Sequence, residues 1–403
     1  MTHTVVEQST YPVSDVDPFS REYLVDPYPF HEQLREAGPI VWLHKWNCWG
    51  TGRYKEMNEI LADPQTFCSG AGVGIANFND EKPWRPPSLL LEADPPAHTK
   101  RRAVVGKVLS AGNLRRLRAD FEVEAQALVE RILEKKQVDA VREIAEPYIL
   151  KVFPDAVGLD ESGRENLLAY GAMVFNAFGP QNDVYQESMR GIETVRDWIM
   201  ASYSREKLRP GGLGQQVYEA ADSGEVTLEE APILVRSFLS AGVDTTVNAI
   251  GNAIWCLATH PDQWKKLHAN PALAPSAFVE VVRFESPFQS YFRTSTRDTS
   301  IAGVPIAGNQ KVFLSVGAAN RDPRRWERPN SFDIERQNAG HMGFGAGIHG
   351  CIGQMIARLE TEVLFTTMAR RISAIEVTGP TTPRLNNVLR GLDTLPVTLH
   401  AAP

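Results

Sequence analysis

Apolar residues recur at helical spacing along most of the chain, and short apolar runs interrupt this pattern at a few places. The helical spacing predicts helices over residues 29–37, 55–62, most of 96–286, and 352–371. The short runs, rich in β-branched and aromatic residues, predict strands over 40–43, 290–296 and 311–315. The sequence therefore predicts a mainly α fold with a small β region.

Two long segments follow no regular pattern. Residues 69–90 are rich in glycine and proline, and residues 320–343 contain two prolines. Loops of this length are uncommon in compact domains unless they serve a function. No linker or charge block divides the chain. We therefore expect an N-terminal extension over 1–20 and a single domain over 21–403.

Composition narrows the choice of partners and compartment. The chain has 42 basic and 49 acidic residues, and its net charge of −7 argues against nucleic acid as the main partner. No apolar run reaches the roughly 18 residues of a membrane-spanning helix, and the N-terminus does not resemble a secretory signal. The four cysteines show no paired spacing, which is typical of a protein in the reducing cytoplasm.

The segment from Phe344 to Gly353 carries the most specific chemistry in the sequence. It places Cys351 among several glycines, which let a backbone fold tightly against a flat group. The helix expected just after Cys351 directs its dipole and free N–H groups at the sulfur, and this favours a thiolate. A thiolate under a planar surface is what an axial haem ligand requires, and such a ligand favours O–O cleavage.

Other interpretations of this segment stay open from the residues alone. The glycine spacing also matches a dinucleotide-binding fingerprint, but no predicted strand precedes it. A zinc site made of His341, His349 and Cys351 lacks a fourth ligand at the usual spacing. A purely structural glycine-rich turn is the third alternative.

The order Phe-Gly-x-Gly-x-His-x-Cys-x-Gly resembles the haem-binding loop of the cytochrome P450 monooxygenases. The resemblance extends over roughly residues 20–400 and implies the fold of that family. It implies haem b between a long central helix and the helix that follows the cysteine. Cys351 would be the iron ligand, and Phe344, His349 and Gly353 would be further contacts of the haem.

The long central helix is expected over residues 229–259. Ser237, Ser240, Asp244 and Asn248 fall three or four residues apart and share one face of this helix. Polar groups on a buried helix need partners or water. Two interpretations remain: the face lines a wet cavity, or its hydroxyls bond back to the preceding turn.

Within this helix, Ala241-Gly242-x-Asp244-Thr245 resembles the oxygen-activating segment of the family. The resemblance implies that Asp244 and Thr245 form an acid–alcohol pair that delivers protons during dioxygen activation. Gly242 is expected to weaken the helix locally and to leave space beside the iron.

Two further motifs follow from the resemblance. Glu280 and Arg283 share a helix face and, with Arg336, imply a structural network behind the haem loop. The haem propionates need cations or hydrogen-bond donors. The matching positions in this chain are His98, Arg102, Arg293 and His349.

Within the family, the chain resembles the bacterial monooxygenases of para-substituted benzoic acids. Those enzymes hold a carboxylate far from the iron, and arginine and hydroxyl donors suit a carboxylate. The resemblance implies the following substrate-binding residues: Arg85, Ser88, Phe175, Phe178, Arg236, Ser237, Ser240, Ala241 and Tyr291. Tyr291 stands where relatives commonly carry phenylalanine, which bears on the para group or ring length that fits.

These features together predict a cytoplasmic haem-thiolate monooxygenase that is a monomer. It would use dioxygen and two electrons to hydroxylate or O-demethylate the para substituent of a small aromatic carboxylic acid, of the benzoate or cinnamate type. Two alternatives are a peroxide-driven peroxygenase of the same fold and a non-catalytic sensor of haem or small molecules.

The source of electrons is expected to be a separate protein, because the sequence shows no reductase domain, flavin motif or iron–sulfur cysteine set. The resemblance implies a ferredoxin with its ferredoxin reductase. An acidic ferredoxin would dock by charge on a basic cluster. The cluster consists of Lys100, Arg101, Arg102, Arg115, Arg116 and Arg118.

Overall fold

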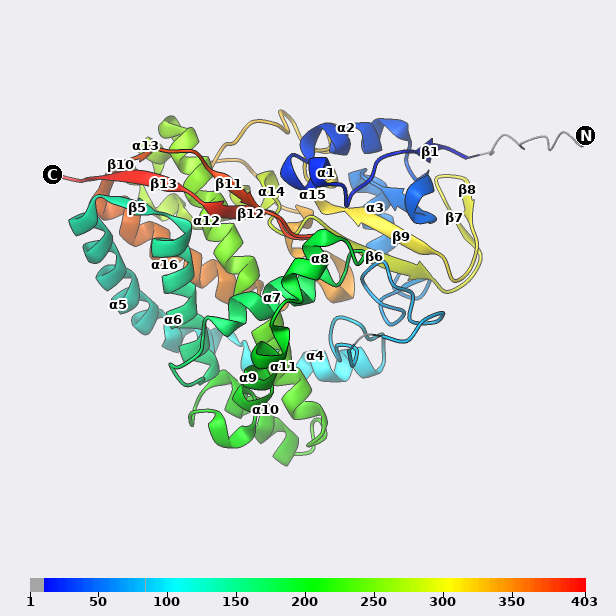
Figure 1. The fold of residues 1–403 in the computed structure, drawn as a ribbon, viewed down its shortest axis with the longest axis horizontal. Coiled ribbons are helices and arrows are strands. Elements are labelled where there is room, and N and C mark those ends of the chain that lie inside the picture. Colours follow the sequence, from blue (N-terminus) through cyan, green and yellow to red (C-terminus); the bar gives the residue numbers. More distant parts are fainter. Residues whose placement is uncertain (1–10, 84) are drawn as a thin grey trace, which may run out of the picture.

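The computed structural model describes residues 11–83 and 85–403, and it is mainly helical (Figure 1). Its first helices are α1 (Arg21–Val25), α2 (Tyr28–Ala37), α3 (Tyr54–Ala62), α4 (Ala97–Val108), α5 (Ala111–Lys135), α6 (Glu146–Val157), α7 (Asn166–Asn176) and α8 (Asp183–Ser188). The others are α9 (Ile192–Ser202), α10 (Leu213–Asp222), α11 (Glu230–Ala241), α12 (Asp244–Thr259), α13 (Pro261–Ala269), α14 (Ala274–Phe284), α15 (Val316–Ala319) and α16 (Gln354–Arg371).

The β structure is small, and its main sheet lies on the right of Figure 1, away from the bulk of the helices, while the strands near the C-terminus lie on the opposite side beside helices. A six-stranded sheet has the order β1-β2-β3-β9-β6-β4. Its strands are β1 (Val13–Ser14), β2 (Val41–Leu43), β3 (Cys48–Thr51), β4 (Phe67–Cys68), β6 (Ser290–Ser295) and β9 (Lys311–Ser315). The smaller sheets contain β5 (Gln137–Asp139), β7 (Thr299–Ile301), β8 (Val304–Ile306), β10 (Ile372–Val377), β11 (Thr382–Arg384), β12 (Gly391–Thr394) and β13 (Pro396–Ala401).

The predicted fold class is confirmed, and most predicted elements lie within two residues of their observed bounds. The strand predicted over 311–315 is β9, and the helix predicted over 352–371 is α16. Residues 1–10 of the predicted N-terminal extension lie outside the described residues. Further along that extension, β1 pairs in parallel with β2 as an edge of the main sheet. Among the described residues, no helix is both long and apolar enough to cross a membrane.

The sequence predicted one central helix over 229–259, but the chain forms two helices there, α11 and α12. The prediction of a single helix is therefore wrong. The ring of Phe153 on α6 packs directly against Gly242, where a Cβ would come within 2.0 Å of Phe153 Cζ. No larger residue fits there without moving the ring. The hydroxyls of Thr245 and Thr246 donate to the carbonyls of Ala241 and Gly242, at 2.7 and 3.1 Å. These bonds satisfy backbone acceptors at the break, which would otherwise be costly to bury.

A buried ion network fixes the irregular segment over 320–343. The side chains of Glu280 and Arg283 on α14 are fully buried and form two hydrogen bonds of 2.7 and 2.8 Å. Arg283 also donates to the carbonyls of Asn320 and Pro329, each at 3.0 Å. Arg336 adds a bond from Nε to Glu280 Oε1 at 3.1 Å. The network thus ties this segment to the helix that packs beneath the cysteine loop.

Candidate active site

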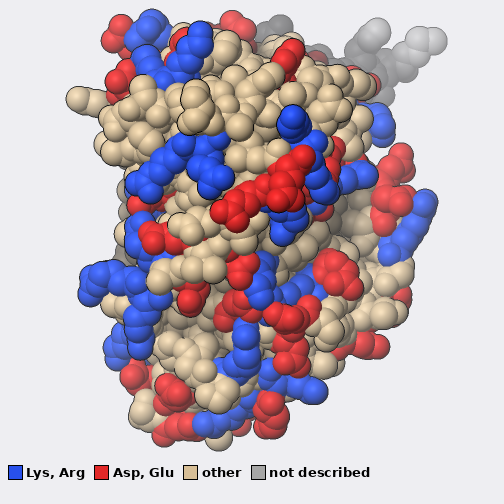
Figure 2. Space-filling model, turned by 90° about the vertical axis from the view of Figure 1, so that its left-hand side faces the viewer, with Lys and Arg blue, Asp and Glu red and all other residues tan. Residues whose placement is uncertain are grey.

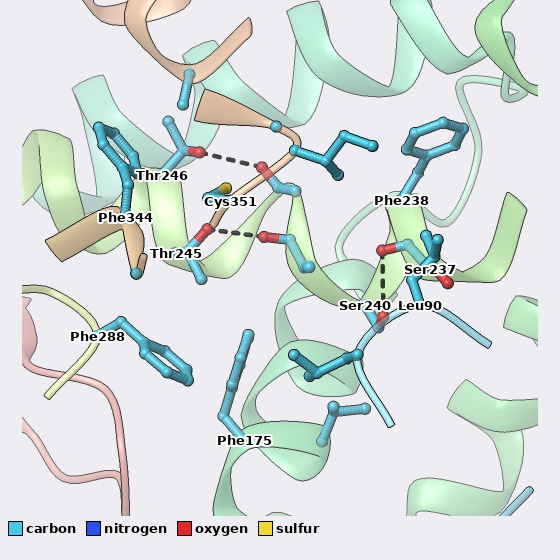
Figure 3. A pocket seen from close by; sticks show the side chains of 18 of the residues that line it. Leu90, Phe175, Ser237, Phe238, Ser240, Thr245, Thr246, Phe288, Phe344 and Cys351 are labelled. Carbon is cyan, nitrogen blue, oxygen red and sulfur yellow. Dashed lines mark hydrogen bonds between the residues drawn. The ribbon is translucent and has the colours of Figure 1, made fainter. Parts of the chain in front are cut away.

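A largely apolar cavity of about 320 Å³ lies where α11, α12, β6 and the cysteine loop meet (Figure 3). Cys351, Thr245 and Thr246 lie at one end of this view, and Leu90, Ser237 and Ser240 lie at the other. The two helices on either side of the break therefore line different parts of the cavity: α11 contributes Ser237 and Ser240, and α12 contributes Thr245 and Thr246.

The backbone of the cysteine loop requires glycine where it turns. Gly345 and Gly347 have φ values of 69° and 65°, which other residues rarely adopt. At Gly347 a Cβ would also come within 2.3 Å of the Leu61 carbonyl oxygen. The Cys351 N–H donates to the Phe344 carbonyl at 2.7 Å and closes the loop. The thiol is thereby held at the cavity wall, just before α16 begins.

Opposing effects act on the pKa of the Cys351 thiol. Burial has the largest effect and leaves the pKa raised, whereas the backbone N–H groups of Gly353 and Gln354 and the guanidinium of Arg102 act in the opposite direction and favour the thiolate. The N–H groups belong to the start of α16, as expected from the sequence. The loop can therefore stabilise a thiolate on the cavity side.

Four basic side chains gather beside Cys351. His98 and His349 lie against one another with ring centroids 4.3 Å apart, and Arg102 and Arg293 line the same cavity. Burial is the main cause that lowers the pKa of both histidines, that of His349 to about 3. Both ring nitrogens of His98 and Nε2 of His349 are buried without a hydrogen-bond partner in the described structure. Such a set of donors fits a ligand with two carboxylates.

Asp244 does not face the cavity as the sequence pattern predicted. Its side chain is turned toward Gly171 on α7 and is buried. Arg384 Nη1 lies 3.6 Å from Asp244 Oδ1, and Asn248 donates to the same oxygen at 3.3 Å. Burial raises the pKa of Asp244 to about 6, although Arg384 acts in the opposite direction.

The helix break explains this change of direction. A regular helix would place Ser237, Ser240, Asp244 and Asn248 on one face, but the break at residues 242–243 separates the two halves. Thr245 and Thr246 line the cavity instead. The hydroxyls of Ser237 and Ser240 bond back to the carbonyls of Ile233 and Ser237, at 3.1 and 3.3 Å. Both serines also line the cavity. They therefore do both things that the sequence left open: they face the cavity, and their hydroxyls bond back to the preceding turn.

The two arginines at the far end of the cavity differ in their partners. Arg85 Nη1 lies 2.8 Å from Glu92 Oε2, and Glu92 is buried. The backbone N–H of Ser88 also donates to Glu92, at 2.7 Å. Arg236 donates to the Pro86 carbonyl at 3.3 Å, and no described carboxylate lies within ion-pair distance of it. At this end of the cavity, the charge of Arg85 is balanced by Glu92, whereas the charge of Arg236 is balanced by no described carboxylate. Arg236 can therefore pair with an anionic ligand.

Aromatic rings form a wall between the two ends. Phe175 makes edge contacts with Phe178 and with Phe288, each with ring centroids 5.8 Å apart. Phe288 and Tyr291 are also 5.8 Å apart, and the Arg293 guanidinium lies 4.9 Å from the Tyr291 ring. Burial raises the pKa of Tyr291 to about 12, so its hydroxyl stays protonated at neutral pH. Such a wall suits a flat aromatic ligand.

Comparison with known proteins decides the family. The family model described as "Cytochrome P450" matches residues 212–390. The chain is 52% identical to cytochrome P450 CYP199A2 of Rhodopseudomonas palustris over 388 residues, which is 96% of this chain and 94% of that protein. The chain belongs to the cytochrome P450 family. It is also 30% identical to cytochrome P450 107B1 of Saccharopolyspora erythraea, over 96% of this chain and 99% of that one.

Solved structures agree with this assignment. Cytochrome P450 CREJ in complex with (4-ethylphenyl) dihydrogen phosphate superimposes with a TM-score of 0.86 at 26% identity, over 95% of this chain and 99% of that chain. Cytochrome P450 CYP109Q5 from Chondromyces apiculatus superimposes with a TM-score of 0.80 at 27% identity, over 96% and 98%.

The site of this cytochrome P450 fits the cofactor of its family, haem b held by a cysteine thiolate. Cys351 would supply the sulfur, because it is the cysteine that lines the cavity, and the glycines of its loop leave the cavity side open for a flat ring. His98, His349, Arg102 and Arg293 would supply donors for two propionates, and both ring nitrogens of His98 and Nε2 of His349 are the buried atoms that lack partners in the described structure. Phe344 and Gly353 complete the lining next to Cys351.

Two side chains that the sequence did not predict belong to this cytochrome P450 site. Arg384 reaches Asp244 from β11, 140 positions further along the chain, and no local pattern indicates that contact. Glu360 on α16 lines the cavity and is fully buried. A signal for Glu360 did exist, because a lone carboxylate interrupts the apolar face formed by Ile356, Leu359 and Val363.

Proposed function

We propose that this cytochrome P450 oxidises the para substituent of a small aromatic carboxylic acid of the benzoate or cinnamate type. The observation that supports the proposal is the division of the cavity into three parts. Arg236, Ser237 and Ser240 lie at one end, aromatic rings line the middle, and Cys351 and Thr245 lie at the other end. If the carboxylate of a rigid aromatic acid lies at the polar end, then only its para substituent lies near Cys351 and Thr245, where the haem would bind.

Two resemblances support this substrate class. The motif residues match those of the bacterial monooxygenases of para-substituted benzoic acids. The solved cytochrome P450 CREJ is in complex with (4-ethylphenyl) dihydrogen phosphate, which is a para-alkyl phenyl ring that bears an anionic group. A benzoate has the same division into an anionic end, a ring and a para substituent.

The roles of the residues at the anionic end follow from their partners. Arg236 would bind the carboxylate, next to Ser237 and Ser240, whose hydroxyl hydrogens are donated to backbone carbonyls in this structure. Arg85 would act mainly as a support, because Glu92 already balances its charge. Ser88 accepts from the N–H groups of Leu90 and Leu91 and so shapes the loop that carries Arg85. Ala241 lies between the polar end and the helix break and leaves room for the ring.

When bound, the haem supplies the iron at which dioxygen is reduced by two electrons. The protein residues would exclude water, orient the ring and supply protons. Thr245 faces the cavity and Asp244 faces the half-buried ion pair of Arg384 and Glu146. The pair is thus suited to carry protons from that cluster to the cavity through the helix break.

The proposal is tested by product analysis with the ortho, meta and para isomers of methoxybenzoate. The para isomer should lose its methyl group as formaldehyde, the meta isomer should react much more slowly, and the ortho isomer hardly at all. Positioning of the ring rather than bond strength causes this order. The three isomers are compared at matched concentration with a competent ferredoxin and reductase. Comparable rates for the three isomers would contradict the proposed pose.

Arg236→Ala should weaken the binding of 4-methoxybenzoate about 10- to 100-fold, measured by the substrate-induced spin shift. The reason is the loss of a charge-assisted hydrogen bond, which is worth about 1.5–3 kcal/mol. The binding of the uncharged amide should change far less. Arg190→Ala, at an arginine with 76% exposure on the surface, is the control. Equal losses for acid and amide would remove Arg236 from the carboxylate site.

We also propose that a separate ferredoxin with its reductase supplies the electrons to a monomeric, cytoplasmic enzyme with one catalytic domain over 21–403. The structure changes the expected docking surface, because part of the basic cluster is already paired. Arg101 lies 2.7 Å from Glu230, and Arg118 lies 2.9 Å from Glu362. Basic and acidic side chains are interspersed over the face shown in Figure 2. Among the described residues, no ion pair involves Lys100, Arg115 or Arg116, so these members of the cluster are left for a charged partner.

A further inference from the structure

A short buried loop, residues 386–390, lies behind the cavity and is called here the brace loop. It connects β11 to β12, and none of the described residues that line the cavity belongs to it. Four of its side chains are at most 5% exposed: Asn386, Asn387, Val388 and Leu389. Two neighbouring asparagines in such surroundings need hydrogen-bond partners. Their partners show which parts of the cavity wall the loop holds.

Asn387 fastens the brace loop to the C-terminal end of α7. Its backbone N–H donates to Asn176 Oδ1, and its side-chain Nδ2 donates to the Asn176 carbonyl, each at 2.8 Å. The side-chain amides of Asn387 and Asn182 also bond to one another in both directions, at 2.8 and 3.2 Å. A Cβ at Gly179 would come within 2.6 Å of the Asn387 side chain, so the packing is tight. The end of α7 that carries Phe175 is therefore fixed by one amide.

The same loop holds the segment that carries Phe288. Phe288 and Leu389 face each other in an antiparallel β-bridge. The N–H of Gln289 donates to the Val388 carbonyl at 2.7 Å, and a second backbone bond of 2.8 Å joins residues 287 and 390. The backbone on both sides of Phe288 is thus tied to the brace loop.

A third contact joins the brace loop to α12. Asn252 donates to the Arg390 carbonyl at 2.9 Å. Gly391, the next residue, packs so closely on α12 that a Cβ there would lie 1.8 Å from Asn248 Oδ1. The loop therefore rests on a helix of the cavity and cannot move toward it without displacing these groups.

Phe175 and Phe288 meet at the cavity with ring centroids 5.8 Å apart, although they belong to segments more than 100 positions apart (Figure 3). We propose that Asn387 is a positioning residue of the cavity, which holds these two rings in place through the brace loop and so determines how firmly a single flat ring is held. A wall whose parts are already fixed loses less freedom when a ligand binds. The residue acts through the wall and does not touch the ligand.

The first test compares two nitrogen ligands of the iron in the haem-loaded protein, imidazole and 4-phenylimidazole, by the shift of the haem absorption band. In Asn387→Ala, 4-phenylimidazole should bind about 10-fold more weakly, the size of effect that one good aromatic contact gives. Imidazole has no phenyl ring to meet the wall and should bind as in the wild type. A general loss of structure would weaken both ligands alike. Equal changes for the two ligands, or no change for either, would overturn the proposal.

A second variant reaches the same point without removing any amide. Gly179→Ala places a methyl group against the Asn387 side chain, which must then shift. The affinity ratio of the two ligands should change in the same direction as in Asn387→Ala. If Asn387→Ala does not fold, Gly179→Ala decides, and a wild-type ratio in that variant would refute the role of Asn387.

Asn113→Ala is the matched control. Asn113 is half-buried, and its side-chain amide donates to the Val108 carbonyl at 2.7 Å and to Gln216 at 2.6 Å, outside the lining of the cavity. Its loss removes bonds of the same kind without touching the brace loop, so the ratio should stay at the wild-type value. An equal change of the ratio in this control would overturn the proposal, because any lost amide would then have the same effect.

The last test rests on the proposed function and uses the methoxybenzoate isomers. In Asn387→Ala the ratio of para to meta demethylation should fall about tenfold, because a ring held less firmly also presents its meta substituent. A wild-type ratio would contradict the positioning role. If aromatic acids are not substrates, the wild type itself gives no product from either isomer, and the imidazole titration still decides. The two proposals therefore fail in different ways.

Discussion

Cys351→His is expected to abolish the red-shifted absorption band of the reduced, carbon monoxide-bound protein. The band would require the Cys351 thiolate to hold the haem iron, because a thiolate ligand pushes electron density onto the iron. Cys351 is the cysteine of the cavity, and the loop around it is closed by its own N–H and shaped by Gly345 and Gly347. Imidazole can bind haem iron, but it cannot supply this electron density. Monooxygenase product should therefore be lost together with the band.

A matched control separates ligand loss from loss of folding. Cys68→Ser changes a half-buried cysteine in β4 that lies outside the lining of the cavity, and it should keep the band and the product. Haem content and the thermal unfolding temperature are measured for both variants. Retention of the red-shifted band in a folded Cys351→His protein would contradict the assignment of the ligand.

The cysteine loop was predictable because its chemistry is local. Ten consecutive residues hold the glycines, the thiol and the start of the helix, so spacing along the chain is sufficient to describe them. Glu280 and Arg283 are local in the same sense, since an i,i+3 pair on a helix is defined by sequence. The observed bonds between them have lengths of 2.7 and 2.8 Å.

The errors arose where contacts between distant segments decide the geometry. The direction of Asp244 depends on the break at Gly242, and this break depends on Phe153 from another helix. The spacing of polar residues on a regular helix contains no information about that contact. Likewise, the sequence indicates that Arg85 is a cation available to the substrate. In the structure it forms an ion pair with Glu92, seven residues away in an irregular loop.

The ion cluster at Asp244 gives the helix break a functional meaning. Arg384 lies between Asp244 at 3.6 Å and Glu146 at 2.5 Å, and Asp393, which is 45% exposed, lies 3.9 Å from the same guanidinium. Charged groups thus continue from the surface to the inner side of α12. Thr245, the next residue in the chain, faces the cavity. Adjacent residues at the break therefore face opposite sides of the helix.

Asp244→Asn is expected to lower the rate of product formation by about 10²-fold or more, which is the effect typical of a lost general acid. The amide keeps the shape and can still accept a bond from Arg384, but it cannot release and recover a proton. Binding of 4-methoxybenzoate should be unchanged, because Asp244 lies outside the lining of the cavity. Thr245→Ala should divert electrons to hydrogen peroxide with little effect on binding. Wild-type product per electron in both variants would exclude the pair from proton delivery.

Stability measurements give an independent check on the charge state of Asp244. In the folded protein its pKa is about 6, mainly because of burial, against the ordinary value of 3.8. The folded state therefore binds more protons than the unfolded state between these two values, and ionisation of Asp244 weakens folding as the pH rises through that window. The free energy of unfolding of the wild type, relative to Asp244→Asn, should fall from pH 3.8 to about 6 and then level off. A difference that rises with pH would mean that Arg384 outweighs burial, and Asp244 would then be a fixed ion-pair partner that holds no proton to deliver at neutral pH.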